Sequence, residues 1–117
     1  MKLLSLSVLM LLTFRKHVVE KYEGGSPYHS HLIVTLFSDS TFTYSTWYHS
    51  SPKTTRTYKG VWHKSPGKLM LDSEKGHGVF HNETFNLKGD TLRLYSRKDY
   101  IENPRFYREY FTLIRKP

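Results

Sequence analysis

TYKGVWHKSPGKLMLDS, residues 57–73, is the stretch of sequence that decides the fold. Its first half alternates between two faces, and one face holds three residues: Tyr58, Gly60 and Trp62. This period of two is typical of an extended strand. Residues 65–68 then form a turn, because proline fixes φ near its turn value and glycine accepts positive φ. Leu69 and Leu71 return on one face, so the stretch predicts a β-hairpin.

Two strands are expected upstream of this hairpin. Residues 31–37 form an apolar run that is rich in β-branched side chains, and residues 41–49 alternate between two faces. Both patterns favour strands. The short segment 38–40 between them predicts a turn in which Asp39 caps the backbone. Residues 50–53 are expected to form an exposed loop before the central hairpin.

Further strands are expected downstream. Residues 74–78 contain two glycines and predict a loop. Residues 79–87 read as a strand that turns back at 88–90, because alternating apolar runs flank a glycine-containing turn. The charged segment 97–104 is expected to be irregular, with room for one helical turn. Residues 107–115 alternate again and predict the last strand.

The fold class that these strands predict is all-β. About six or seven antiparallel strands at short, regular spacing are typical of a barrel or a sandwich. Consecutive hairpins make a meander, and a meander of this strand count removes its exposed edges best by closing on itself. We therefore expect a small closed barrel over residues 31–117. No dinucleotide-binding motif, phosphate-binding loop, internal repeat or long amphipathic helix is present in the sequence.

The N-terminus predicts a separate segment. Lys2 precedes an uncharged, mostly apolar run at 3–14, which is shorter than the ~20 residues that a membrane-spanning helix needs. A positive charge followed by a short apolar run is typical of a secretory signal, so residues 1–14 are interpreted as signal-like. The alternative is that they join the fold as a first strand or a docked helix. Residues 15–30 are polar and turn-rich, and are interpreted as a linker.

Charge and cysteine content limit the partners and the chemistry. The formal net charge is +8, with 18 Lys and Arg against 10 Asp and Glu. A basic balance of this size favours an acidic partner such as nucleic acid, an anionic membrane surface or an acidic polysaccharide. The alternative is a basic, soluble surface without a dedicated partner. Cysteine is absent, which excludes disulfides, a thiol nucleophile, a thiolate metal site and a lipid-modified cysteine.

Four short motifs carry a resemblance to a known group of proteins. They are SDSTFTY at 38–44, KGVW at 59–62, KLML at 68–71 and FNLKGDTL at 85–92. In this order they resemble the small lipocalin-like barrels of bacterial envelope proteins. The resemblance implies an exported or envelope-attached barrel. The chain lacks the N-terminal lipid-anchoring cysteine common in that group. The glycine-x-tryptophan of lipocalins proper lies on their first strand, so residues 60–62 are not read as that signature.

Catalytic and metal-binding patterns are weak. His29 and His31 would share a face of a strand, but no third or fourth ligand stands at a telling spacing, as a zinc site requires. No nucleophile-elbow motif accompanies the serines, and the acidic residues are not paired. We therefore expect no metal, no cofactor and no catalytic residue, so the protein is not interpreted as an enzyme.

Ligand binding is the function that these aromatic residues favour. The interior candidates are Phe42, Tyr44, Tyr58, Trp62 and Phe85, accompanied by Leu92 and Leu94. A barrel of this scale holds either side chains or one small ligand, so the alternative is that these residues only fill the core. Trp47, followed by Tyr48 and His49 and close to Lys53 and Arg56, is the exposed candidate. Aromatic and basic groups together suit stacking on bases or sugars.

The expected function is a non-catalytic binding or structural module of the cell envelope. Its expected location is exported, either periplasmic or membrane-associated, and its expected partner is a small apolar ligand or an envelope component. The alternative is a basic barrel of the oligonucleotide-binding kind that binds single-stranded nucleic acid through basic and aromatic groups. The sequence indicates no particular oligomeric state.

Overall fold

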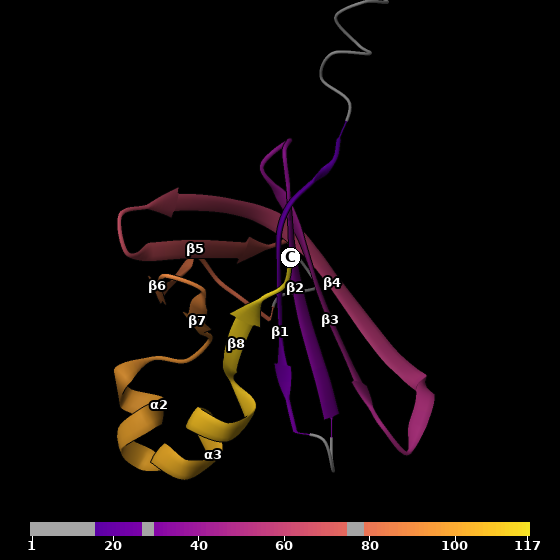
Figure 1. Cartoon of the computed structure of the whole chain (residues 1–117), viewed down its shortest axis with the longest axis vertical. Coiled ribbons are helices and arrows are strands. Elements are labelled where there is room, and N and C mark those ends of the chain that lie inside the picture. Colours follow the sequence, from indigo (N-terminus) through magenta and orange to yellow (C-terminus); the bar gives the residue numbers. More distant parts are fainter. Residues whose placement is uncertain (1–15, 27–29, 75–78) are drawn as a thin grey trace, which may run out of the picture.

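The chain folds into a closed antiparallel barrel (Figure 1). The structure is a computed structural model, which describes residues 16–26, 30–74 and 79–117. Eight strands occur in these residues, and each pairs with the next in sequence while β8 pairs with β1. The strands are β1 (Val18–Gly25), β2 (Ser30–Phe37), β3 (Thr41–Tyr48), β4 (Ser51–Ser65), β5 (Lys68–Ser73), β6 (Glu83–Lys88), β7 (Thr91–Arg93) and β8 (Thr112–Arg115). The prediction of an all-β meander that closes into a barrel is confirmed.

The central hairpin is formed by β4 and β5, as the sequence predicts. Ser65 pairs with Lys68 at the turn, and Trp62 pairs with Leu71. Gly67 has φ +74°, the left-handed conformation that glycine adopts without strain. The predicted strands at 31–37 and 41–49 are confirmed as β2 and β3. In the turn between them, the backbone N–H of Thr41 donates to Asp39 Oδ1 at 3.0 Å.

The barrel begins earlier than the sequence predicts. The interpretation of 15–30 as a linker is wrong for β1, which pairs with both β2 and β8. Its Tyr22 is completely buried. The glycines that suggested a turn serve a different purpose: a Cβ at Gly24 would lie 2.9 Å from Leu113 Cγ, so glycine allows β1 to approach β8 closely. The signal-like segment 1–14 lies outside the described residues.

The C-terminal region contains two helices that shorten the last strand. The interpretation of 107–115 as one strand is wrong, because α3 (Pro104–Tyr110) occupies its first half and only β8 follows. Asn103 caps α3 by accepting from the Phe106 N–H at 3.4 Å, and Pro104 takes the first helical position, where it loses no hydrogen bond. The helical turn expected within 97–104 is present as α2 (Arg97–Glu102).

Two other boundaries differ from the sequence predictions. The expected loop at 50–53 is reduced, since β4 already begins at Ser51. The expected strand at 79–87 begins only at Glu83. Asn82 has φ +50°, outside the strand region, and donates its N–H to Asp72 Oδ1 at 2.9 Å. The predicted loop at 74–78 falls largely outside the described residues.

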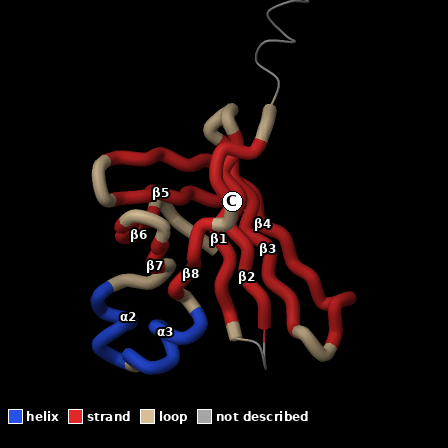
Figure 2. The backbone as a smooth tube through the Cα atoms, viewed as in Figure 1, coloured by secondary structure: helices blue, strands red, loops and turns tan. Residues whose placement is uncertain are grey.

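The core consists of apolar side chains that alternate along the strands and point inward. In β2 and β3 the buried residues follow a period of two, as expected for strands with one face on a core. The buried set is Tyr22, Leu32, Val34, Leu36, Phe42, Tyr44, Leu69, Leu71, Phe80, Phe85, Leu87, Leu92, Leu94 and Leu113. Both helices lie together beyond β7 and β8 (Figure 2). Neither is long and apolar enough to cross a membrane, and the same holds for the rest of the described chain.

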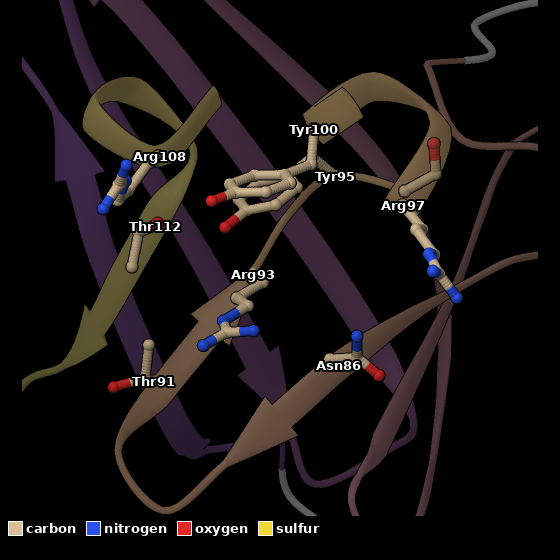
Figure 3. A pocket seen from close by; sticks show the side chains of 9 residues that line it. Asn86, Thr91, Arg93, Tyr95, Arg97, Tyr100, Arg108 and Thr112 are labelled. Atoms are coloured by element: carbon tan, nitrogen blue, oxygen red, sulfur yellow. The ribbon is translucent and has the colours of Figure 1, made fainter. Parts of the chain in front are cut away.

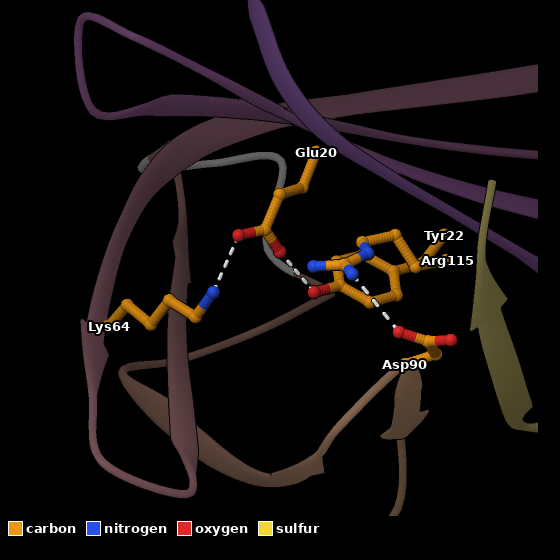
Figure 4. A network of polar contacts seen from close by, with 5 residues as sticks. All are labelled: Glu20, Tyr22, Lys64, Asp90 and Arg115. Carbon is orange, nitrogen blue, oxygen red and sulfur yellow. Dashed lines mark hydrogen bonds and ion pairs between the residues drawn. The ribbon is translucent and has the colours of Figure 1, made fainter. Parts of the chain in front are cut away.

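One end of the barrel is closed by polar side chains, which we call the polar end: Glu20, Tyr22, Lys64, Asp90 and Arg115 (Figure 4). Lys64 Nζ lies 2.5 Å from Glu20 Oε1, and the Tyr22 hydroxyl donates to the same carboxylate. Arg115 Nη2 lies 3.1 Å from Asp90 Oδ1. Burial alone would raise the pKa of Glu20, but hydrogen bonds from Lys64 and Tyr22 outweigh it and hold the pKa below its ordinary value. These hydrogen bonds and ion pairs lie across this end of the barrel.

Candidate functional site

The middle of the barrel is filled by an aromatic cluster around Phe80. The Phe80 ring centroid lies 6.1 Å from that of Phe42, 5.3 Å from Tyr44 and 5.4 Å from Phe85. Phe80 itself is 5% exposed and comes from the segment before β6. Of the sequence-predicted ligand residues, Phe42 and Phe85 are thus packed inside the core with Phe80 as their neighbour. Leu92 and Leu94 are buried in the same core.

Trp62 packs beside the core as a partly buried residue of β4. Its indole Nε1–H donates to the backbone oxygen of Phe37 at 2.9 Å. The same face of β4 then carries Lys64, two residues further on, toward the polar end. The structure therefore places Trp62 between the core and the closed end, where its one polar group already has a partner.

Tyr44 and Tyr58 meet at the open end of the barrel and line a groove. Their ring centroids lie 6.0 Å apart with an interplanar angle of 32°. The groove has a volume of about 400 Å³, within the range of small-molecule sites. We call it the mouth groove, and its main lining residues are Leu32, Tyr44, Arg56, Tyr58, Phe106 and Phe111. Two sequence-predicted residues, Tyr44 and Tyr58, are thus brought together at one accessible site.

Helix α3 supplies the wall of the mouth groove that the sequence analysis did not anticipate. Phe106 packs on Tyr110 with ring centroids 4.8 Å apart and on Phe111 at 5.7 Å. All three residues border the groove opposite the strands. A signal for this wall was present, since asparagine followed by proline at 103–104 is a helix start. The alternating pattern at 107–115 indicated a strand instead, so this helix start was not recognised.

The polar groups of the mouth groove are mostly hydroxyls, those of Ser30, Thr46 and Thr54 and those of its tyrosines. Arg56 is its one charged lining residue among the described residues, and no carboxylate borders it there. Burial, with a smaller contribution from the neighbouring Tyr58 phenol, raises the pKa of Tyr44 to about 12. The Tyr44 side chain is therefore a neutral hydroxyl at any physiological pH. It makes no hydrogen bond to another described residue, so the hydroxyl can pair with a ligand.

Trp47 borders the mouth groove but stacks on the outside of the barrel. Its ring centroid lies 4.7 Å from that of His31, which in turn lies 5.9 Å from His49. His49 Nε2 is 2.9 Å from the backbone oxygen of Ser26, and Glu23 Oε2 is 3.6 Å from His31 Nε2. The predicted exposed site around Trp47 is therefore a rim next to the groove. His29, the predicted companion of His31, lies outside the described residues.

Metal-binding geometry does not appear in the described part of the chain. No group of three or more His, Asp or Glu side chains converges there. The residues that line the mouth groove offer aromatic faces, phenol and aliphatic hydroxyls and one guanidinium. Such groups bind and orient a ligand by stacking, apolar burial and hydrogen bonding.

In comparisons with known proteins, no protein-family model, no curated protein and no solved structure matches the chain. Its functional interpretation depends on its own geometry.

Proposed function

We propose that this protein is an exported, non-catalytic binding barrel of the lipocalin-like kind, and that it holds a small, largely apolar ligand in the mouth groove. The observation that carries the proposal is the contrast between the two barrel ends. The polar end is closed by ion pairs and hydrogen bonds, whereas the opposite end presents a groove with aromatic walls. A ligand bound there would contact Tyr44, Tyr58 and Phe106.

The fold supports the lipocalin-like part of the proposal. Eight antiparallel strands in sequential order form an up-and-down barrel, the arrangement in which lipocalins bind small ligands at or inside the mouth. In this chain Phe80 occupies the interior, so the ligand is held at the mouth. Export and an envelope location, periplasmic or membrane-associated, are inferred from the signal-like residues 1–14.

The groove chemistry narrows the ligand class. Aromatic walls favour a planar, apolar molecule. The Tyr44 hydroxyl offers one hydrogen bond, and Arg56 offers a positive charge at the rim. The expected ligand is therefore a flat apolar molecule with a polar or anionic group at one edge, delivered from solution or from an envelope component.

A fluorescence titration tests the groove as a binding site. The probe is anilinonaphthalene sulfonate, which combines fused rings with one anionic group. We expect saturable binding that Tyr58→Ala weakens about tenfold or more, since this removes one aromatic wall. Val61→Ala is the matched control, because Val61 lies on the same strand and is 50% exposed away from the groove. Equal affinity of both variants and the parent protein contradicts the proposal.

Export is tested separately by mass spectrometry of the mature N-terminus in the native host. Removal of residues 1 to about 14 is the expected result for a cleaved signal. An intact N-terminus on a protein recovered from the cytoplasm contradicts the envelope location while leaving the groove proposal standing.

The second candidate function is binding of single-stranded nucleic acid. The net charge of +8 and the position of Arg56 beside Tyr58 and Trp47 favour it. The strand order differs from that of the oligonucleotide-binding fold, which is a five-stranded Greek-key barrel, so this candidate depends on the surface alone. Binding of an oligothymidylate that weakens steeply with rising salt would support it. Salt-insensitive or absent binding excludes it.

A further inference from the structure

A second pocket lies on the outer face of the barrel, beneath the two helices (Figure 3). It has a volume of about 470 Å³. We call it the arginine pocket, after three of its main lining residues: Arg93, Tyr95, Arg97, Tyr100, Arg108 and Thr112. These residues come from β7, the segment after it, α2, α3 and β8. They belong to a different part of the surface from the mouth groove, because Arg108 faces the pocket while Phe106 and Tyr110 of the same helix face the groove.

Every charged side chain that lines the arginine pocket is positive. No Asp or Glu lines it, and none of its three arginines forms an ion pair within the described chain. The two helices carry three carboxylates, and that of Glu102 at the end of α2 does not line the pocket. Asp99 accepts from the Ser96 N–H in the cap of α2, and Glu109 pairs with Arg105 at 3.2 Å. Like charges gathered around one hollow repel each other unless an anion lies between them.

Two of the arginines, Arg93 and Arg108, line the same part of the pocket wall as Thr112. Arg93 extends from β7 toward the middle of the pocket, and Arg108 lines it from α3 on the other side, next to Thr112 (Figure 3). Arg97 lies at the opposite rim and points away from them. Guanidinium groups bind phosphate oxygens bidentately and remain charged at every physiological pH. The space between Arg93 and Arg108 therefore suits a phosphate group.

Hydroxyl groups add to this polar side of the pocket. The phenol oxygens of Tyr95 and Tyr100 point toward the side where Arg93 and Arg108 lie (Figure 3). Thr112 also lines the pocket, and its hydroxyl oxygen is the one buried side-chain polar atom without a hydrogen-bond partner among the described residues. An unpaired buried hydroxyl is costly in a protein interior, and a bound ligand or water beside it would remove that cost.

The tyrosines also supply an aromatic surface. Tyr95 and Tyr100 stack with their ring centroids 6.0 Å apart and an interplanar angle of 16°. The Tyr95 ring centroid also lies 6.0 Å from that of Tyr107. Tyr100 remains 37% exposed, so its ring can accept a further planar group. Base-on-aromatic stacking is a common means of holding a planar ring beside a bound phosphate.

We infer that the arginine pocket binds a small phosphorylated ring compound of the nucleoside monophosphate class. Arg93 and Arg108 hold the phosphate, and Tyr100 stacks on the ring. The pocket volume is in the range of sites for single small molecules. This inference is independent of the proposed function, which concerns the mouth groove and an apolar ligand.

Isothermal titration calorimetry of the full chain tests the inference with three probes: adenosine monophosphate, adenosine and inorganic phosphate. We expect adenosine monophosphate to bind most tightly, because only it engages both the arginines and Tyr100. Arg93→Ala should weaken its binding about tenfold or more, the loss expected for a charge-assisted hydrogen bond. Arg108→Ala should also weaken the binding of adenosine monophosphate. Because the two substitutions lie on different elements, a loss seen in both is not explained by a folding defect of one variant.

Two control variants distinguish binding in the arginine pocket from a general attraction of the basic protein for anions. Lys98→Ala and Arg105→Ala each remove one positive charge, from α2 and α3 respectively, but neither residue lines the arginine pocket. Both should leave the affinity for adenosine monophosphate within about twofold of the parent protein. Tyr100→Ala should weaken adenosine monophosphate while leaving inorganic phosphate unchanged, since phosphate does not use the ring.

Each contrary result overturns a stated part of the inference. Absence of binding, or equal losses in Arg93→Ala and Lys98→Ala, overturns the site. Equal affinity for inorganic phosphate and adenosine monophosphate overturns the ring class of the ligand. A much tighter, strongly salt-dependent interaction with a single-stranded oligothymidylate overturns the small-molecule assignment and replaces it with nucleic acid.

Discussion

Lys64 Nζ lies 2.5 Å from Glu20 Oε1, although the two residues belong to strands that are not neighbours in the sheet. Two strands, β2 and β3, separate β1 from β4 along the barrel wall. The ion pair therefore crosses the end of the barrel instead of following a strand ladder (Figure 4). It closes that end, and it does so with a carboxylate that is only 14% exposed.

Removing this carboxylate should destabilise the closed barrel. Glu20→Gln loses the charge that pairs with Lys64 and weakens the hydrogen bond from Tyr22. We expect a loss of about 1 kcal/mol in the free energy of unfolding at neutral pH, measured by urea denaturation. Lys59→Ala, on the same strand as Lys64, is the control and should have almost no effect. An unchanged unfolding free energy in Glu20→Gln would show that the ion pair does not stabilise the end.

The same carboxylate should make stability sensitive to acid. The pKa of Glu20 in the folded protein is below its ordinary value of 4.5. Its contribution to stability is then complete above pH 4.5 and is lost as the pH falls through the lower, folded pKa. The parent protein should lose more stability than Glu20→Gln between about pH 5 and pH 3. Parallel stability curves for the two proteins would refute this role.

Alkaline pH should destabilise the barrel through its buried tyrosines. Burial raises the pKa of Tyr44 to about 12 and that of Tyr22 well above its ordinary value of 10.0. The unfolded chain therefore loses these protons from pH 10 upward while the folded chain retains them, so stability falls as the pH rises. Each such tyrosine contributes a slope of about 1.4 kcal/mol per pH unit.

Tyr44→Phe measures this contribution directly. The variant keeps the ring and removes the ionisable group, so its stability should fall less steeply than that of the parent protein between pH 10 and about 12. Tyr48→Phe is the control, because Tyr48 is 52% exposed. The same slope in all three proteins, measured by denaturation at fixed pH values, would contradict the placement of Tyr44.

Phe80 should be the residue whose truncation opens the barrel interior. It contacts three aromatic rings in the core, including those of Tyr44 and Phe85. Phe80→Ala should cost about 3–5 kcal/mol in the free energy of unfolding, because it leaves a cavity. Phe106→Ala, which removes a ring that is 40% exposed, should cost far less. Similar losses in both variants, measured by urea denaturation, would contradict the central position of Phe80.

Gly60 should tolerate no side chain. A Cβ at this position would overlap the backbone oxygen of Asp72 and would lie 2.7 Å from Phe42 Cε1. Gly60→Ala therefore forces β4 and β5 apart, at an expected cost of about 1–3 kcal/mol. A Cβ at Gly67 would meet no other atom within 4 Å, but this residue has a positive φ, so Gly67→Ala is a comparison in which only backbone strain acts. A fully stable Gly60→Ala protein, judged by its melting temperature, would rule out the close approach.

The central hairpin was predictable because all of its signals are local. Alternation along β4, the proline-glycine turn and the returning leucines all act within residues 57–73. The first strand was not predictable in the same way. Gly24 reads as a turn residue, and the contact that explains it comes from Leu113, near the other end of the chain. Pairing of β1 with β8 is a property of the closed barrel and leaves no short-range pattern.

The candidate sites also contain residues that the sequence could predict and residues that it could not. Tyr44 and Tyr58 were identifiable because both occupy inward positions on predicted strands. The aromatic wall from α3 was missed, since Tyr107 and the residues after it alternate as a strand would. The arginine pocket was beyond prediction, because Arg93 and Arg108 come to line one pocket only after two helices fold over the barrel.

The measurement that tests the account most directly is chemical-shift mapping by NMR with anilinonaphthalene sulfonate and the isotope-labelled protein. If the mouth groove is the binding site, the largest shifts will fall on Tyr44, Tyr58 and Phe106, while Lys64 at the polar end stays unchanged. Largest shifts at the polar end, or no saturable shifts at all, would contradict the proposal that this barrel binds its ligand at the mouth.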